Sequence, residues 1–326
     1  MADIAERVGV TQATVSMVLN KSRSSVRISD TTRKKILRAA EELNYSPSFH
    51  ARALAKGRTF VFGLIVGEIQ SPHFSELSSL AMEVAESHGY HLLLSVTQWS
   101  YEKELECLDM LLQHRVDGII FGSGALRPGT RQYEYITSQK YPIVILGPHS
   151  ENFSIVQSDW DPGMDQAIAY LKDKGHGRIG YIYDPGIDKS QDSKRQSFEA
   201  ACLRHGLTWE YFGCPPQITD ARRLGVDLAR RPDRPGAILV QSDFLTTGFM
   251  RGLYDRGVQV PRDIAVVGCD GTAAGEYFLP PITSIAQDRL ELMTRGINVL
   301  LEMIEHRDLP RREILVPTKL IARDSA

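Results

Sequence analysis

The sequence predicts a small all-α domain at the N-terminus, followed by a larger α/β body with parallel sheets. Short helical patterns joined by a glycine-containing turn fill the first 43 residues, whereas strand-like apolar runs alternate with helical patterns from Phe60 onward. The charge also changes sign along the chain. Residues 1–58 carry 11 Lys and Arg against 5 Asp and Glu, and the rest of the chain carries 27 against 35. A basic head on an acidic body is expected when only the N-terminal end contacts phosphates.

The first two helices have the pattern of a helix-turn-helix. Residues 3–8 place Ile4, Ala5 and Val8 on one apolar side, and Gly9 and Val10 supply a tight turn. In the second helix, the 100° spacing separates two sides. One is a core side, made of Thr14, Val15, Val18 and Leu19. The other is polar or small, made of Gln12, Ala13, Ser16, Met17 and Asn20, with Thr11 as the N-cap. Such a second helix fits the major groove of DNA, and a helical hairpin at the edge of a globular domain is the alternative.

A basic loop and a third helix follow. Residues 21–27, which include Arg27, are polar and basic and could reach phosphates. Ser29 is the expected cap of the third helix, in which Ile36, Ala40 and Leu43 face the first two helices. Its outer side carries Arg33, Lys34 and Arg38. These cations are expected to contribute electrostatic affinity for nucleic acid, and an ordinary solvated helix face is the alternative.

Residues 47–55 are predicted to form a short helix with an apolar stripe of Ala51, Leu54 and Ala55, and residues 56–58 end this segment. So short a helix is not stable alone. A plain interdomain linker is the alternative interpretation.

The body alternates between strand-like and helical runs. The strand-like runs lie at 60–66, 91–96, 118–121, 143–146, 179–183, 237–240, 264–267 and 319–322. The helical patterns include 74–88, 102–114, 164–174, 193–205, 245–256 and 289–306. This alternation predicts parallel sheets covered on both faces, and there are too many βα units for one compact sheet.

The N-terminal motifs closely resemble the lactose-repressor (LacI/GalR) family of bacterial transcription regulators. The matching residues are Asp3-Ile4-Ala5, Gly9-Val10-Thr11, Thr14-Val15-Ser16, Asn20, Thr32-Arg33, 43–47 and 51–54. The resemblance implies that Gln12, Ala13 and Met17 read bases, with phosphate or scaffold roles for Thr11, Thr14, Ser16 and Asn20. It also implies a hinge helix that inserts Leu54 into the minor groove. Family members usually have a few more residues before the first helix, so we expect a clipped or misassigned N-terminus.

The resemblance also implies the domain organisation. Residues 1–46 would bind DNA, 47–58 would form the hinge and 59–326 would bind an effector and dimerise. The last domain would have two lobes like those of periplasmic binding proteins, one of residues 59–158 and 288–316 and the other of residues 159–287 and 317–326. The chain would cross between the lobes near Asp159, Gln287 and Pro317. Two later segments, 175–180 and 267–270 followed by 280–283, also match the family.

Candidate effector residues follow the strands, because open parallel sheets bind ligands beyond their carboxyl ends. Carried over by position, they are His73, Phe74, Ser123, Lys194, Arg195, Asp243 and Asp270. An aromatic ring with carboxylates and a cation suits a polyhydroxylated ligand such as a sugar. Asp243 and Asp270 could instead be helix caps, and Phe74 could belong to the core.

Several classes of protein are disfavoured. No run of about 20 apolar residues could span a bilayer, and no signal peptide is present, so we expect a cytoplasmic protein. Cys107, Cys202, Cys214 and Cys269 lack metal-ligand spacing and are expected to be reduced and mostly buried. No catalytic or cofactor motif is found. We therefore expect a ligand-responsive repressor that binds a pseudo-palindromic operator as a homodimer, without a cofactor. A solute-binding protein without a DNA role is the alternative.

Overall fold

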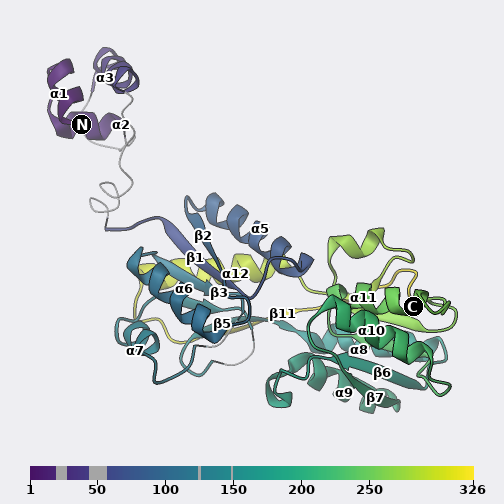
Figure 1. The fold of residues 1–326 in the computed structure, drawn as a ribbon. Coiled ribbons are helices and arrows are strands. Elements are labelled where there is room, and N and C mark those ends of the chain that lie inside the picture. Colours follow the sequence, from purple (N-terminus) through teal and green to yellow (C-terminus); the bar gives the residue numbers. More distant parts are fainter. Residues whose placement is uncertain (20–27, 44–56, 124–125, 148–149) are drawn as a thin grey trace. The chain divides into compact units, whose positions relative to one another are not determined.

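A computed structural model describes residues 1–19, 28–43, 57–123, 126–147 and 150–326. The chain divides into two compact units, Met1–Thr59 and Phe60–Ala326 (Figure 1). In the described ranges, no helix combines the length and the apolar character needed to cross a lipid bilayer.

The described residues of the first unit form three helices, α1 (Ala2–Val8), α2 (Gln12–Leu19) and α3 (Asp30–Glu42). Gly9 ends α1 with φ 73°, in the left-handed conformation that glycine adopts readily. The hydroxyl of Thr11 accepts a hydrogen bond from the Thr14 amide at 3.2 Å, and Ser29 accepts one from the Thr32 amide at 3.2 Å. The predicted turn and both predicted caps are therefore confirmed.

The three helices share one small apolar core. It consists of Ile4, Ala5, Val15, Val18, Ile36, Ala39 and Ala40. The prediction that Leu43 belongs to this core is wrong, because α3 ends at Glu42 and the Leu43 side chain is 40% exposed. Ala39 fills that side of the helix instead.

The second unit contains two six-stranded sheets, and the first is entirely parallel. Its strands are, in spatial order, β11 (Glu313–Pro317), β5 (Ser154–Asp159), β4 (Ile143–Ile145), β3 (Gly118–Phe121), β1 (Val61–Val66) and β2 (His91–Val96). One core packs α5 (Pro72–Ser87) and α12 (Arg289–Glu305) on this sheet, and another packs α6 (Tyr101–Gln113) and α7 (Arg131–Ser138). We call this sheet and its helices the N-lobe.

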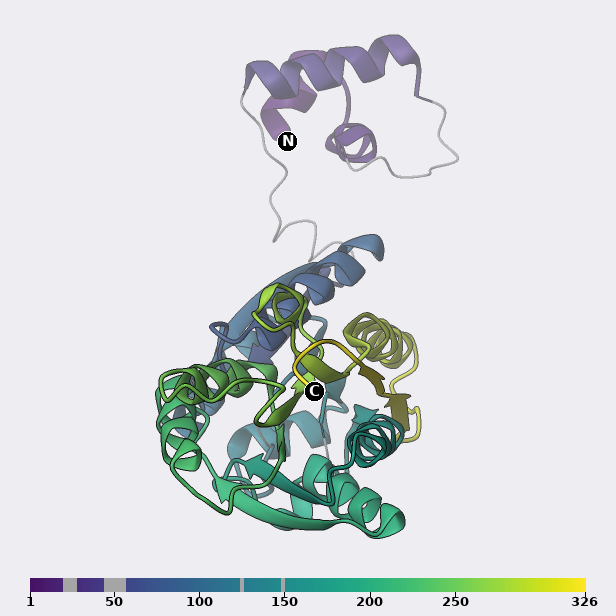
Figure 2. The same cartoon turned by 90° about the vertical axis from the view of Figure 1, so that its right-hand side faces the viewer.

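The second sheet and its helices form the C-lobe. Its strands are β12 (Lys319–Ile321), β10 (Thr283–Ala286), β9 (Ala265–Asp270), β8 (Ala237–Val240), β6 (Arg178–Tyr183) and β7 (Thr208–Gly213). One core contains α8 (Trp160–Asp173) and α9 (Ser193–His205), and another contains α10 (Ile218–Ala229) and α11 (Asp243–Tyr254), so helices cover both faces (Figure 2). The short 3-10 helices η1 (Lys189–Gln191) and η2 (Ala273–Tyr277) complete it. The predicted parallel sheets are confirmed, with one exception at the edge of this sheet, where β12 is antiparallel to β10.

The chain passes between the two sheets three times. β5 of the N-lobe leads directly into α8 of the C-lobe, β10 leads back into α12, and β11 leads into β12. Each lobe is therefore built from separate stretches of the sequence. The connecting residues around Asp159, Gln287 and Thr318 lie where side chains from both lobes meet, as in the hydrogen bond from Ser158 to Gln287.

Candidate functional site

The outer side of α2 is the candidate nucleic-acid surface. Thr11, Gln12 and Ala13 are exposed, and Ser16 and Met17 are half-buried. Thr14 is also half-buried, and its hydroxyl lies 2.9 Å from that of Thr11. The two buried residues of α2 are Val15 and Val18, which face the core. The other predicted DNA-binding residues, Asn20, Arg27 and Leu54, lie outside the described residues.

Basic side chains surround this surface, but some are already paired. Glu42 accepts hydrogen bonds from Arg7 at 2.5 Å and from Arg38 at 2.9 Å. Arg33, Lys34 and Lys35 are exposed and make no ion pair with another residue in the described ranges. These three cations of α3 are therefore the better candidates for phosphate contacts.

Lys194 and Asp270 form the centre of the candidate effector site in the C-lobe. The Lys194 Nζ lies 3.0 Å from Asp270 Oδ1 and donates to the Gln241 carbonyl at 2.8 Å. It also lies 4.4 Å from the centre of the Trp160 ring, a cation–π distance. Burial lowers the pKa of Lys194, but the neighbouring Asp270, Cys269 and Asp192 together raise it by more, so the net shift of the Lys194 pKa is upward. Lys194 therefore carries a positive charge at neutral pH.

Gln287 connects this pair to the N-lobe. Its Nε2 donates to Asp270 Oδ1 at 2.9 Å and lies 3.5 Å from His73 Nδ1, while its Oε1 accepts from the Ser158 hydroxyl at 2.7 Å. Burial, helped by the positive charges of Lys194 and Arg289, lowers the pKa of His73 to about 4 against the opposing effect of Asp270. His73 is therefore neutral at pH 7, with one donor and one acceptor nitrogen.

Aromatic side chains stand beside His73. Phe74 contacts the ring of His73 edge-on at 4.9 Å between centroids and that of Trp99 at 5.5 Å. Trp99 is 55% exposed. The backbone of Gln98 (φ 53°) and of Trp99 (φ 61°) lies in the left-handed region. The ring packs on Gly67, where a Cβ would lie 2.7 Å from ring atoms.

Two predicted effector residues lie apart from this group. The Arg195 guanidinium stacks on the rings of Tyr183 at 4.5 Å and Tyr211 at 4.1 Å, and lies 3.6 Å from Glu199. It therefore fastens α9 to the sheet. The buried Ser123 hydroxyl, after β3, has no hydrogen-bond partner in the part of the chain that the structure describes.

Asp243 is near the group but is enclosed by the C-lobe, with a residue exposure of 1%. Its Oδ1 accepts from the Ser284 hydroxyl at 2.6 Å, and its Oδ2 accepts from the Thr272 amide at 2.7 Å. Ser242, rather than Asp243, caps α11. Burial and the charge of Asp270 raise the pKa of Asp243 to about 7 against these hydrogen bonds. The structure therefore encloses Asp243 within the C-lobe, away from solvent.

Sequence reasoning did not select Trp99, Trp160, Gln241 or Gln287. From the sequence, Gln287 was predicted only as a place where the chain crosses between the lobes, and this crossing is the one signal that could have identified it. Nothing in the sequence pattern singled out Trp160, which opens α8 beneath Lys194. All four cysteines are free and three are buried, as predicted, and the described ranges contain no cluster of His, Cys, Asp and Glu that could hold a metal ion.

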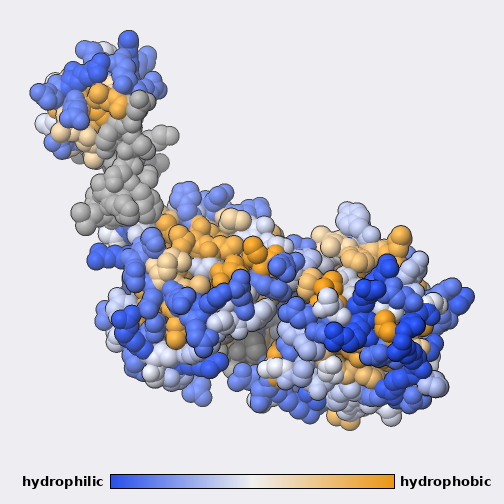
Figure 3. All heavy atoms as spheres, viewed as in Figure 1, coloured by the Kyte–Doolittle hydropathy of each residue, from blue (hydrophilic) through white to orange (hydrophobic). Residues whose placement is uncertain are grey.

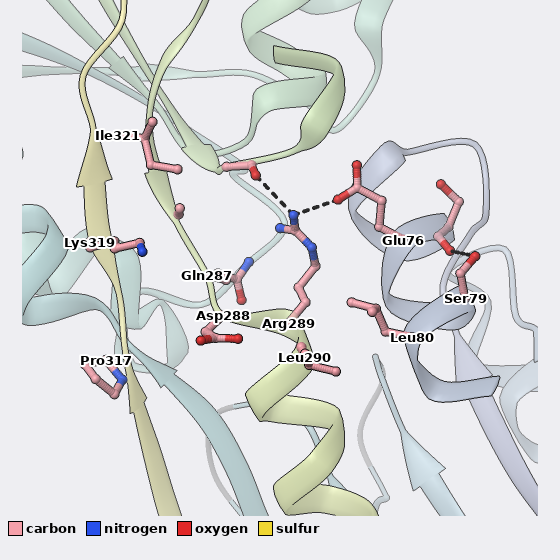
Figure 4. Close-up of a pocket in the computed structure, with 13 residues that line it drawn as sticks. Glu76, Ser79, Leu80, Gln287, Asp288, Arg289, Leu290, Pro317, Lys319 and Ile321 are labelled. Carbon is pink, nitrogen blue, oxygen red and sulfur yellow. Dashed lines mark hydrogen bonds and ion pairs between the residues drawn. The ribbon is translucent and has the colours of Figure 1, made fainter. Parts of the chain in front are cut away.

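A pocket of about 720 Å³ lies between the lobes (Figure 4). It is lined by Ser75, Glu76, Ser79, Leu80, Gly271, Ala286, Gln287, Asp288, Arg289, Leu290, Pro317, Lys319 and Ile321. All seven predicted effector residues are described, and none of them lines it. Gln287 touches both regions, and Arg289 crosses the pocket toward Glu76.

Comparisons with known proteins agree with this architecture. The family model "Bacterial regulatory proteins, lacI family" matches residues 1–48, and "Periplasmic binding protein-like domain" matches residues 168–326. The HTH-type transcriptional repressor PurR of Mannheimia succiniciproducens is 31% identical over 99% of this chain and 97% of its own length. The ribose operon repressor of Escherichia coli is 32% identical over 100% and 99%.

Solved structures are similar as well. The lac repressor dimer bound to operator and the anti-inducer ONPF has a TM-score of 0.85 at 23% identity, covering 99% of this chain and 97% of that one. The regulator CelR in complex with cellobiose has a TM-score of 0.73 at 25% identity, covering 99% and 98%. The fold and the candidate sites of this chain define a two-unit, ligand-responsive type of DNA-binding regulator. The chain belongs to the lacI family of bacterial regulatory proteins. It is thus a transcriptional regulator and not an enzyme, as the sequence predicted.

Proposed function

We propose that this protein represses transcription by binding a pseudo-palindromic operator as a homodimer, under the control of a sugar-like effector. The observation that carries the proposal is the presence, in one chain, of an exposed α2 surface and of the separate network of Lys194, Asp270 and Gln287. We assign residues 1–46 to DNA binding, 47–58 to the hinge and 59–326 to effector binding and dimerisation, in the cytoplasm. A solute-binding protein without a DNA role would not need a helix-turn-helix unit.

In the DNA-binding role, Gln12 pairs bidentately with adenine, and Ala13 and Met17 contact thymine methyl groups. Thr11, Ser16 and the α3 cations position the module on the phosphates. Asn20, Arg27 and the wedge residue Leu54 are assigned from the family resemblance. Two-fold symmetry of the dimer then requires a nearly palindromic operator.

In the effector role, each polar group has a partner on a polyhydroxylated ligand. Asp270 accepts from ligand hydroxyls, Gln287 and neutral His73 both donate and accept, and Lys194 donates. Phe74 and Trp99 would cover an apolar face of the ligand. The cellobiose complex of CelR and a similar LacI-type structure complexed with D-xylulofuranose, 26% identical with a TM-score of 0.70, support a sugar as the ligand class.

An apolar surface supports the homodimer. Hydrophobic residues gather over the region of α5 and β2 (Figure 3), where Met82 is 43% exposed. Leu290 and Leu279 are also exposed. A monomer rarely leaves so much apolar surface in contact with water, so we assign these residues to the dimer interface.

A salt series on duplex DNA tests the DNA-binding role. Full-length protein is titrated by fluorescence anisotropy against the gene's own upstream region and against a shuffled duplex of the same composition. Affinity for the native duplex should fall at least tenfold between 50 and 200 mM salt, because bound phosphates release counterions. Lys34→Met should reduce the slope of log affinity against log salt by about 1, and Arg295→Met, on the other unit, should not change it. Absence of binding to the native duplex at 50 mM salt would refute the proposal.

A further inference from the structure

The backbone that carries Asp270 is strained and is held from the opposite lobe. We propose that Arg289 and Glu76 of the N-lobe are positioning residues that hold the turn of residues 270–273, here called the Asp270 turn, so that Asp270 faces the effector. This inference rests on the proposed function insofar as Asp270 contacts the effector. It adds a link between the effector site and two N-lobe helices, α5 and α12.

The strain is visible in the backbone angles. Asp270 has φ 105°, which residues with a side chain rarely adopt, and Gly271 follows with φ 64°. A Cβ on Gly271 would lie 2.3 Å from the Cβ of Ala286, so the turn is also tightly packed. Such a backbone conformation persists only where surrounding contacts enforce it.

Arg289 supplies two of these contacts. Its Nη1 donates to the carbonyl of Asp270, and its Nη2 donates to the carbonyl of Gly271 at 3.1 Å. The side chain is only 10% exposed. A guanidinium offers several donors in a rigid plane, so it fixes both carbonyls in one orientation.

Glu76 completes the arrangement from α5. One carboxylate oxygen lies 2.6 Å from Arg289 Nη2, and the other accepts from the Ala273 amide at 3.0 Å. Glu76 therefore orients Arg289 and also binds the far end of the Asp270 turn. Two N-lobe side chains thus contact three of the four residues in the turn.

The position of Arg289 in its helix supports a specific role. It is the first residue of α12, whose N-terminus carries a partial positive charge that disfavours cations. The C-lobe binds the turn chiefly through its amides, with Ser284 accepting from Gly271 and Asp243 accepting from Thr272. At the lobe crossing, the carbonyl of Asp270 also accepts a 3.3 Å contact from the amide of Gln287.

A consequence for regulation follows. Any change in lobe arrangement that separates Arg289 from the Asp270 turn removes two of the hydrogen bonds that hold the strained backbone. An effector that binds Asp270 therefore favours one lobe arrangement over the other, and the lobe arrangement alters effector affinity by the same factor.

Hydrogen exchange measured by mass spectrometry on the full-length protein tests the positioning role without DNA or effector. Arg289→Met should increase exchange in the peptide covering 270–273 at least tenfold. Arg289→Lys keeps the charge but loses the planar fork, so its increase should be smaller. The matched control is Arg295→Met, on the same helix, which breaks an exposed pair with Glu291. Wild-type exchange in both Arg289 variants would overturn the proposal. If Arg289→Met unfolds, the Arg289→Lys variant decides.

The link to DNA is tested with the same variants and Glu76→Gln on the upstream duplex. A change of at least fivefold in duplex affinity for Glu76→Gln and Arg289→Lys, in either direction, with Arg295→Met within twofold of wild type, supports the link. Unchanged affinity in every variant overturns the link. If wild-type protein binds no duplex, the proposed function fails, whereas the exchange result still decides the positioning role.

Discussion

At the residue level, Asp243 and Asp270, two of the buried carboxylates of the C-lobe, have opposite surroundings. Asp270 has the ammonium of Lys194 at 3.0 Å and the side-chain amide of Gln287 at 2.9 Å. Asp243 receives only neutral hydroxyl and amide donors and lies close enough to Asp270 to be affected by its charge. A carboxylate without a cation, buried near another carboxylate, tends to hold its proton. The two residues therefore have different tasks although both follow strands.

The first prediction concerns Asp243 and pH. The folded protein keeps this proton up to pH about 7, whereas the unfolded chain releases it near pH 4. The stabilisation linked to this proton is therefore complete below about pH 4 and is lost as the pH rises to about 7. Asp243→Asn cannot titrate. From pH 4 to pH 8 its free energy of unfolding should rise relative to wild type by up to about 4 kcal/mol, as about three pKa units imply.

Urea unfolding at a series of pH values measures this difference. Subtracting wild type from variant removes the contributions of the other ionisable groups, provided that both proteins unfold in two states. A difference that stays constant between pH 4 and pH 8 would show that Asp243 titrates normally in the folded protein.

At the element level, the long apolar strands and the longest helices could be predicted from the sequence, whereas six other elements could not. The continuous apolar runs at β1, β3, β8 and β9 and the long helices α5, α6 and α12 appear within a few residues of their predicted bounds. The prediction did not include β5, β7, β10, β11, α7 and α10. β7 is half-buried along its length at a sheet edge, and β5 becomes polar toward Asp159, so neither forms a continuous apolar run.

The candidate site, too, was predicted only in part. His73, Phe74, Lys194 and Asp270 came from the family resemblance, and the structure places each within contact of another member of the site. Gln287 and Glu76 come together with the Asp270 region only through the lobe crossing. Arg195, adjacent to Lys194, points into the aromatic core of its own lobe instead. Side-chain direction in an irregular crossing depends on tertiary packing, which residue spacing does not encode.

The second prediction, at the element level, concerns the contact between α10 and α11. A Cβ at Gly252 would lie 2.1 Å from the Arg222 carbonyl oxygen and 2.9 Å from the Val226 nitrogen. Both are backbone atoms of α10, so the helices would have to separate. Gly252→Ala should therefore lower the free energy of unfolding by about 2 kcal/mol, although alanine favours the helix itself.

The control is Gly177→Ala, where no atom lies within 4 Å of the added Cβ. Its effect should stay within about 0.5 kcal/mol. Urea midpoints with an unchanged m-value measure both effects. Equal stability of the two variants would mean that the helices can separate at little cost.

At the level of the whole molecule, regulation requires that one ligand distinguishes two lobe arrangements. Ser158, His73, Gln287 and Asp270 form one chain of contacts across the lobes, and Glu76 and Arg289 form another. Both chains end at the same short turn. A ligand at Asp270 therefore acts where interlobe contacts are concentrated, which is the condition for differential affinity.

The last prediction separates effector binding from DNA binding. A thermal-shift screen of pentoses, hexoses and disaccharides first identifies a sugar that raises the melting temperature of wild-type protein. Asp270→Asn keeps a similar shape but replaces a charged acceptor, so affinity for that sugar should fall by about 2–3 kcal/mol, or roughly 30- to 150-fold. Affinity for the upstream duplex without sugar should stay within threefold, because Asp270→Asn leaves the contacts of Arg289 and Glu76 with the backbone of the Asp270 turn in place. Calorimetry and anisotropy measure the two affinities. Normal sugar affinity in the variant would remove Asp270 from the effector site, and a screen without any binding sugar would refute the proposed ligand class.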